Sequence, residues 1–247
     1  SGLSIGFPDS RIFRGFSFTI DNCFKGGANS VWVSSDSDEI LEISKEYGAN
    51  KIKRPDDIAG DFATSESAWL HAINHIEQLE EKIDWVVAPQ VTSPLREERD
   101  ISKGITLAKE NIHDSFFSCS VAEDLFFWQK NEGGNLDSVN YDWRNRKRRQ
   151  DIPKQYIENG SFYIFKPQVL RNTNNRFGSN IGIVEMEFWK MFEIDSFDDL
   201  KMCSAFDSIK LSDIFNIYFC YIYILLLINN YFINFIVINC RRRLHGN

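Results

Sequence analysis

Two carboxylates, Glu193 and Asp195, stand two residues apart late in the chain, immediately before Ser196. On an extended segment this spacing directs both side chains to the same side of the backbone. Carboxylate oxygens are the ligands that Mg²⁺ prefers, together with waters that it retains. Asp195 or Ser196 could equally cap the start of a helix, which is a common role for such residues. The pair therefore predicts a magnesium site or a helix cap, and the residues alone favour the cap.

The densest positive charge of the chain lies in Arg144-Asn145-Arg146-Lys147-Arg148-Arg149. Guanidinium groups stay charged at neutral pH and bind phosphate or carboxylate through paired hydrogen bonds. The run therefore indicates an anion clamp over an active site, but it is also typical of a nuclear localisation signal, a nucleic-acid patch or a solvated surface segment. The whole chain carries 28 basic and 35 acidic residues, for a net charge of −7, which disfavours nucleic acid as the main partner.

Three further polar side chains lie where predicted elements begin or end. Gln90 follows the apolar run Val86-Val87-Ala88-Pro89, so its amide would stand at the end of a strand, where α/β sheets bind ligands. Arg54 could offset phosphate charge, and Ser65 could donate to an anion near the start of a helix. Taken singly, each residue is better explained as a strand-end amide, a surface arginine or a helix cap.

Strands and helices alternate along most of the chain, with short connections between them. The predicted strands cover residues 30–35, 84–88, 114–121 and 163–165, and the helices cover 36–48, 64–80 and 101–110. This alternation predicts an α/β fold with a Rossmann-like, doubly wound and mostly parallel sheet. Aromatic residues and Gly133-Gly134 interrupt the pattern over residues 125–143 and indicate an excursion from the sheet.

The last part of the chain differs in composition from the rest. Residues 214–239 are almost entirely Ile, Phe, Tyr, Leu and Asn, long enough to span a bilayer, with Arg241-Arg242-Arg243 as a basic flank. The asparagines within this segment are poor residues for hydrocarbon, so a read-through or mis-joined tail is favoured over a membrane anchor. We therefore expect an α/β domain over residues 1–210 and a tail over residues 211–247 that is not part of the fold.

The five cysteines are widely spaced, odd in number and contain no CxxC pair. This pattern indicates free thiols in a reducing compartment, not a disulfide framework or a zinc site. The predicted location is the cytoplasm, with the nucleus as the alternative in a eukaryotic host because of the basic run.

Several short motifs follow one another in a fixed order over residues 16–202. They are residues 34–40, 54–55, 61–65, 90–96, 148–151, 158–163 and 193–196. In this order and spacing, the chain resembles the N-acylneuraminate cytidylyltransferases, also called CMP-sialic acid synthetases.

The resemblance implies that the anomeric hydroxyl of a sialic acid attacks the α-phosphorus of CTP, so that pyrophosphate leaves. It matches Asp195 to the family's metal-binding aspartate and Glu193 to its neighbour, which implies Mg²⁺ as the cofactor. Arg146 matches the presumed catalytic arginine, and Arg149 would also lie near the substrate. The resemblance also implies a homodimer in which the excursion reaches the partner's site. The positions that would bind substrate are Arg54, Ser65, Gln90, Gln150 and Asn159.

The chain departs from the family at its start. Relatives open with a strand and a loop, Ala-Arg-x-Gly-Ser-Lys-Gly-x-Pro-x-Lys-Asn, that wraps the triphosphate. Here Ser4-Ile5-Gly6-Phe7-Pro8 is at best a remnant, with Ile5 in place of the lysine. Losing one electrostatic donor typically costs about 10²–10³ in rate.

This departure leaves three expectations open: a CMP-sialic acid synthetase that is impaired by an incomplete N-terminal loop, a cytidylyltransferase for another nonulosonic or 2-keto-3-deoxy sugar acid, or a catalytically dead paralogue that serves as a binding or dimerisation module.

Overall fold

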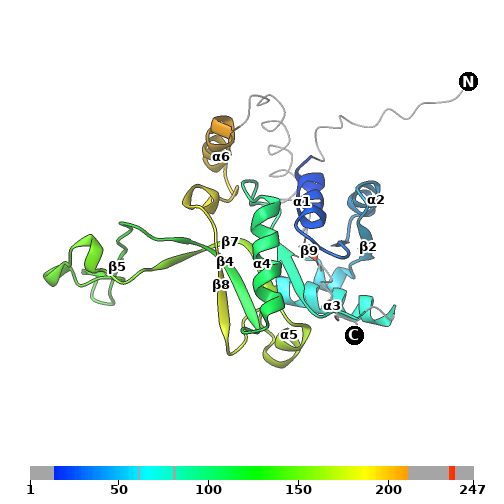
Figure 1. The fold of residues 1–247 in the computed structure, drawn as a ribbon, viewed down its shortest axis with the longest axis horizontal. Helices are drawn as coiled ribbons and strands as arrows, with labels where there is room; N and C mark the ends of the chain where they lie inside the picture. The colour runs from blue at the N-terminus through cyan, green and yellow to red at the C-terminus, as the bar shows by residue number, and fades with distance from the viewer. Residues whose placement is uncertain (1–13, 61, 80–81, 211–233, 237–247) are drawn as a thin grey trace, which may run out of the picture.

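The structure is a computed structural model that describes residues 14–60, 62–79, 82–210 and 234–236 (Figure 1). Its helices are α1 (Arg14–Lys25), α2 (Asp38–Glu46), α3 (Ser65–Gln78), α4 (Glu98–Glu110), α5 (Pro167–Thr173) and α6 (Phe197–Lys210). Its strands are β1 (Trp32–Ser35), β2 (Asn50–Lys53), β3 (Val86–Pro89), β4 (Ser115–Val121), β5 (Trp128–Lys130), β6 (Leu136–Ser138), β7 (Tyr156–Phe165), β8 (Ile181–Glu185) and β9 (Asn234–Ile236). Short 3-10 helices are η1 (Asp56–Ile58), η2 (Trp143–Asn145), η3 (Arg149–Asp151) and η4 (Phe188–Met191). The predicted α/β class is confirmed.

Local sequence explains where the main helices start and stop. The side chain of Thr64 accepts a hydrogen bond from the Ser67 N–H at 3.2 Å and so caps α3, which makes Ser65 the first helical residue. Glu97 and Asp100 form a capping box at the start of α4, and that helix ends at Asn111 in the left-handed conformation. The predicted helices over 64–80 and 101–110 therefore correspond to α3 and most of α4.

The strands form two mixed sheets and one ribbon. The strand orders are β2-β1-β9, β3-β7-β4-β8 and β5-β6. Parallel pairs join β1 to β2 and β4 to β8, whereas β7 runs antiparallel to both β3 and β4. The antiparallel pairing of β7 with β4 arises because these strands are the two legs of one long hairpin, and antiparallel neighbours need no crossover helix. The segment between these legs, residues 122–155, projects from the sheet and is named the arm (Figure 1).

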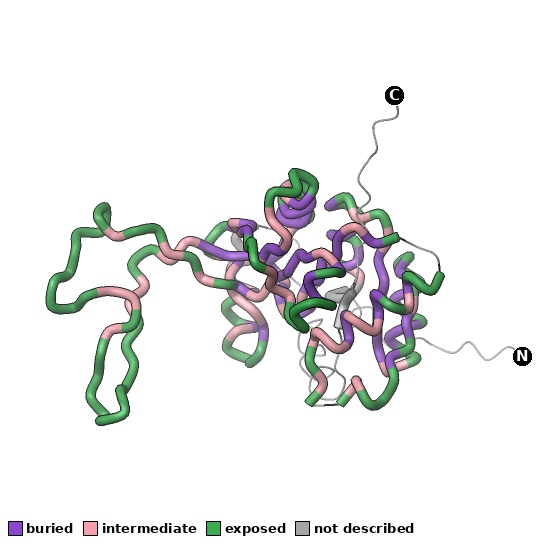
Figure 2. Tube along the Cα trace, turned by 90° about the horizontal axis from the view of Figure 1, so that it is seen from below, coloured by how far each residue is buried: buried purple, intermediate pink, exposed green. Residues whose placement is uncertain are grey.

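Helices cover both faces of the central strands, as in a doubly wound fold. Alternate residues of β7 enter different buried clusters: Ile164 packs with α1, α2 and α4, whereas Tyr163 and Phe165 pack with α3 and α5. This two-residue period is the one that a strand buried on both faces requires. Figure 2 shows the buried residues gathered in this body, while the arm is largely exposed.

Three residues of the tail belong to a sheet. β9 pairs antiparallel with β1, with Trp32 opposite Ile236, and it also contacts β3 and α3. We expected the tail to lie outside the fold, but the unpaired edge of β1 offers N–H and C=O groups to any strand beside it. The remainder of residues 214–239, for which a membrane anchor was the less favoured interpretation, and Ser4 to Pro8 lie outside the described residues. In the described ranges, no helix has the length and apolar character that crossing a bilayer needs.

The close approach of α4 to the sheet depends on Gly104. A Cβ atom at this position would lie 2.6 Å from Ile164 Cδ1 and 3.1 Å from Phe162 Cε2, and both side chains are fully buried. We expect Gly104→Ala to lower the free energy of unfolding by about 1–3 kcal/mol, because overpacking outweighs the better helix propensity of alanine. Urea unfolding measures this, with Ser102→Ala at an exposed position of α4 as the control. Equal stability of both variants would contradict the packing described.

Candidate active site

Glu193 and Asp195 lie in an open pocket of about 450 Å³ between β7 and the loop from η4 to α6. The loop is anchored by Ile194, which is fully buried and whose N–H donates to the Thr92 carbonyl at 2.9 Å. The pocket is lined by Ile157, Glu158, Asn159, Gly160, Tyr163, Met191, Phe192, Glu193, Asp195 and Asp199. Glu193 and Asp195 therefore line the same pocket, on a loop that is anchored to the rest of the fold.

Burial makes the Glu193 carboxylate unstable as an anion. Desolvation, and then the negative charge of Asp195, raise its pKa to about 7, although the hydrogen bond from Ser93 and the positive charge of Arg96 oppose the shift. Gly160 has φ 63°, and a Cβ atom there would lie 1.9 Å from Glu193 Oε1. Only glycine gives the carboxylate this space, so β7 is shaped around Glu193.

The start of α6 is capped by Ser196 and Asp199, which are neighbours of Asp195. The Asp199 N–H donates to Ser196 Oγ at 3.3 Å, and the Ser196 hydroxyl donates to Asp199 Oδ2 at 2.7 Å. Asp195 contributes its backbone N–H, which donates to Asp199 Oδ2 at 3.2 Å. Because Ser196 and Asp199 cap α6, the Asp195 carboxylate, which is exposed, is left for the pocket.

The donor set of the pocket suits Mg²⁺. Glu193 and Asp195 supply oxygen ligands only, and a cation between them would relieve the repulsion that raises the pKa of Glu193. In the part of the chain that the structure describes, no group of three or more His, Cys, Asp or Glu side chains could hold a metal ion. Mg²⁺ would therefore complete its shell with waters and substrate oxygens, as it usually does.

Gln90 is held at the end of β3 by a buried arginine. The Gln90 N–H donates to the Ser161 carbonyl at 2.8 Å. Arg96 is 1% exposed, and its Nη1 donates to the carbonyls of Gln90 at 3.0 Å and Ser161 at 2.6 Å. No separate role was predicted for Arg96 from the sequence. The available signal was a charged residue at the end of an otherwise uncharged strand-and-turn segment, residues 86–96.

Arg54 is buried, which excludes the surface alternative. It is 1% exposed, and its Nε and Nη2 donate to Oγ and the carbonyl of Ser34 at 3.2 and 2.5 Å. Burial lowers the pKa of Arg54 to about 10, against the opposing effect of Asp36. Arg54 thus lies beside the end of β1, while Ser65 starts α3.

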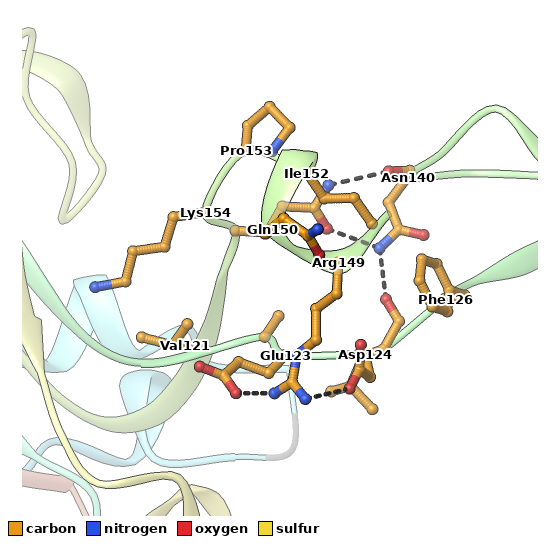
Figure 3. A pocket seen from close by; sticks show the side chains of 13 residues that line it. Val121, Glu123, Asp124, Phe126, Asn140, Arg149, Gln150, Ile152, Pro153 and Lys154 are labelled. Carbon is orange, nitrogen blue, oxygen red and sulfur yellow. Dashed lines mark hydrogen bonds and ion pairs between the residues drawn. The ribbon is translucent and has the colours of Figure 1, made fainter. Parts of the chain in front are cut away.

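Arg149 and Gln150 line a second pocket, at the base of the arm (Figure 3). Arg149 bridges two carboxylates, pairing with Glu123 and, at 3.1 Å, with Asp124. Arg146 stacks on Phe126 with its guanidinium carbon 4.5 Å from the ring centroid. Both arginines are exposed, so the basic run is solvent-accessible on the arm.

The structure does not bring the basic run and the acidic pair into one pocket of a single chain. We expected Arg146 and Arg149 to converge with Glu193 and Asp195, but each pair lines or adjoins a different pocket. The reason is the hairpin of β4 and β7, which carries the arginines out on the arm (Figure 1).

Asn159 lines the acidic pocket, but its side chain already makes hydrogen bonds within the sheet. It is 5% exposed, and its Oδ1 accepts hydrogen bonds from Ser118 Oγ at 2.6 Å and from the Ser161 N–H at 3.2 Å. Its expected contact with substrate would therefore compete with bonds that hold β4 against β7.

Comparisons with known proteins agree with the sequence motifs. No family model matches the chain. It is 31% identical over 145 residues to N-acylneuraminate cytidylyltransferase A of Danio rerio, a match that covers 58% of this chain and 33% of that protein. It is 29% identical over 174 residues to post-translational flagellin modification protein B of Campylobacter coli, covering 70% and 74%. The chain spans about a third of the length of the N-acylneuraminate cytidylyltransferases that it matches first.

A solved structure shares the fold. CMP:2-keto-3-deoxy-manno-octonic acid synthetase, complexed with CTP, superposes with a TM-score of 0.51 at 13% identity, over 79% of this chain and 88% of that one. The predicted resemblance to N-acylneuraminate cytidylyltransferases and the predicted Rossmann-like α/β fold are both confirmed.

The raised pKa of Glu193 predicts a pH-dependent penalty in stability. Below pH 4.5 this carboxyl is protonated in both states; between 4.5 and about 7 only the unfolded chain releases the proton, so stability falls as pH rises. In buffer without divalent cations, Glu193→Gln should gain about 2 kcal/mol over the unchanged chain between pH 4.5 and 8. One pKa unit is about 1.4 kcal/mol, and solvent screening of this partly exposed group reduces the full value of about 3.5 kcal/mol.

Urea unfolding of both chains at several pH values measures this difference. Glu110→Gln, at an exposed position of α4, is the control for removing one carboxylate. A constant difference between Glu193→Gln and the unchanged chain at every pH would show that Glu193 titrates normally.

Proposed function

We propose that the chain is a nucleotidyltransferase that activates a sialic acid with CTP, giving CMP-N-acylneuraminate and pyrophosphate. The anomeric oxygen forms a bond to the α-phosphorus, and the bond from that phosphorus to the pyrophosphate oxygen breaks. The observation that carries the proposal is the pair of carboxylates, the partly buried Glu193 and the exposed Asp195, that line one open pocket. The named activity of the relatives and the fold shared with a CTP-complexed synthetase support it.

Charge is the main obstacle to this reaction, because a triphosphate and a sugar carboxylate must meet. In the proposal, Glu193 and Asp195 hold Mg²⁺, which neutralises phosphate charge when bound. Gln90 presents its amide to the sugar acid from the end of β3, and Ser65 donates its hydroxyl at the start of a helix of 14 residues. Arg54 adds fixed positive charge beside the end of β1.

The catalytic arginines would come from a second copy of the chain. The described residues that line the acidic pocket include no Lys or Arg, whereas Arg146 and Arg149 stand exposed on the arm. The arm also exposes large apolar side chains that a partner could cover, which are Phe127, Trp128, Leu136, Val139 and Trp143. We therefore propose a homodimer in which each arm brings its arginines to the acidic pocket of the partner.

A second candidate function is activation of another acid, such as a 2-keto-3-deoxy sugar acid. The observation in its favour is the fold shared with the synthetase for 2-keto-3-deoxy-manno-octonic acid. A catalytically dead binding module is the third candidate, favoured by Ile5 in place of the family's lysine.

Pyrophosphate release by the full chain, with CTP, MgCl₂ and each of several sugar acids, tests the proposed function. We expect turnover with N-acetylneuraminate, and a loss of about 10²–10³ in kcat/KM for Asp195→Asn, with Glu110→Gln unaffected. Turnover with only another sugar acid would favour the second candidate. Tight CTP binding without turnover would favour the dead module, and absence of CTP binding would overturn the nucleotidyltransferase assignment.

Mixing two inactive variants tests whether the arm acts on the partner. A heterodimer of Arg146→Ala with Asp195→Asn contains one complete site if Arg146 serves the other copy, so random mixing should restore about a quarter of the activity. If Arg146 serves its own chain, every site lacks one group and mixing restores nothing. Sedimentation of the unmixed variants verifies that each forms the same oligomer.

A further inference from the structure

Glu158 carries an exposed carboxylate that is nevertheless fixed in place. Its Oε1 accepts a hydrogen bond of 2.6 Å from the hydroxyl of Tyr163. In a regular strand these two residues, five positions apart, would point to opposite faces. Here the register shifts. Phe117 on β4 pairs with Tyr163 on β7, but Cys119, only two positions along β4, pairs with Glu158, which is five positions from Tyr163. This bulge re-aims the carboxylate into the acidic pocket, a use of bulges that recurs near functional sites.

Tyr163 is held in place by burial and by stacking against Arg176, so its hydroxyl fixes the position of the Glu158 carboxylate. It is 7% exposed, and the guanidinium carbon of Arg176 lies 4.3 Å from its ring centroid and 4.6 Å from that of Trp69. Arg176 is balanced on its other side by Glu66, with Nε 2.8 Å from Oε1. Burial, and then the hydrogen bond to Glu158, raise the pKa of Tyr163, so the hydroxyl stays protonated and donates.

The surroundings of Glu158 determine what it can bind. The described residues that line this pocket include four carboxylates, those of Glu158, Glu193, Asp195 and Asp199, and no Lys or Arg. A fixed carboxylate in such a pocket repels another carboxylate and accepts hydrogen bonds from O–H or N–H groups. It therefore distinguishes the two ends of a sugar acid, one anionic and one rich in hydroxyls.

We infer that Glu158 is a specificity-determining residue that accepts hydrogen bonds from the hydroxyl or amide groups of the sugar acid and turns the sugar's carboxylate away from this wall. The inference rests on the proposed function and adds the orientation of the substrate within the same pocket. Tyr163 and Arg176 act through Glu158 as positioning residues. Glu193 and Asp195, on the facing loop, are left free to hold a cation.

Binding of N-acetylneuraminate to the full chain, loaded with CTP and Ca²⁺ to suppress turnover, tests the inference by saturation-transfer NMR titration. Glu158→Ala should raise the Kd for the sugar acid about tenfold or more, because a charge-assisted hydrogen bond is lost, while the Kd for CTP stays unchanged. Glu158→Gln, which keeps an acceptor oxygen, should have a smaller effect. Tyr163→Phe should raise the Kd severalfold, because the carboxylate is present but no longer fixed.

Pyruvate, a 2-keto acid without the hydroxyl-rich end, separates specificity from general damage to the pocket. Glu158→Ala should leave pyruvate binding unchanged or improve it, whereas a structural defect would weaken both acids equally. Glu110→Gln is the matched control. Unchanged sugar-acid binding by Glu158→Ala would overturn the inference while the proposed function stands. Failure of the unchanged chain to bind CTP or any sugar acid would overturn both.

Discussion

The buried guanidinium of Arg96 is the interaction on which the arrangement of the site depends. A charge removed from water costs several kcal/mol unless hydrogen bonds replace its hydration. Arg96 donates to the carbonyls of Gln90 and Ser161, and its Nη2 donates to Thr19 Oγ1 at 3.3 Å. Three segments distant in sequence, the end of β3, the middle of β7 and α1, are thereby fixed to one group. The same positive charge opposes the rise in the pKa of Glu193. Arg96 therefore both positions the strand ends and stabilises the ionised form of Glu193.

The hairpin of β4 and β7 separates the two charged halves of the predicted site. Its sheet end carries Glu158 and Gly160, which shape the acidic pocket, and its arm carries Arg146 and Arg149. A strand pair is stiff along its length because ladder hydrogen bonds join its legs. The ladder of β4 and β7 ends at the pair of Val121 and Tyr156, and Arg146 and Arg149 lie beyond it on the arm, outside the pocket of Glu193 and Asp195. In the proposed dimer, this geometry makes assembly a condition for bringing the opposite charges together.

The sequence predicted the elements and the polar positions better than it predicted their partners. The strand end at Gln90 and the helix that begins at Ser65 follow from local pattern, because a strand run and a cap are properties of adjacent residues. Burial of Arg54 could not be predicted in this way, since it depends on Ser34, which is 20 positions away. The contact of Glu158 with Tyr163 was equally out of reach, because it exists only through the bulge opposite β4. Pairings across the fold decide these features, and a pattern along the chain does not record them.

The acidic pocket destabilises the folded state, yet its carboxylates are held in defined positions. Burial and the negative charge of Asp195 disfavour the ionised form of Glu193. Glycine at position 160 nevertheless leaves space for the Glu193 carboxylate, and Ser196 and Asp199 provide the helix cap that would have engaged Asp195. A structural role alone would be served by neutral side chains, which avoid the repulsion. The arrangement instead keeps negative charge facing an open space where a cation would be most favourable. A pocket that holds unfavourable charge in a fixed geometry is what electrostatic catalysis requires, because the reorganisation has been completed during folding, before substrate arrives.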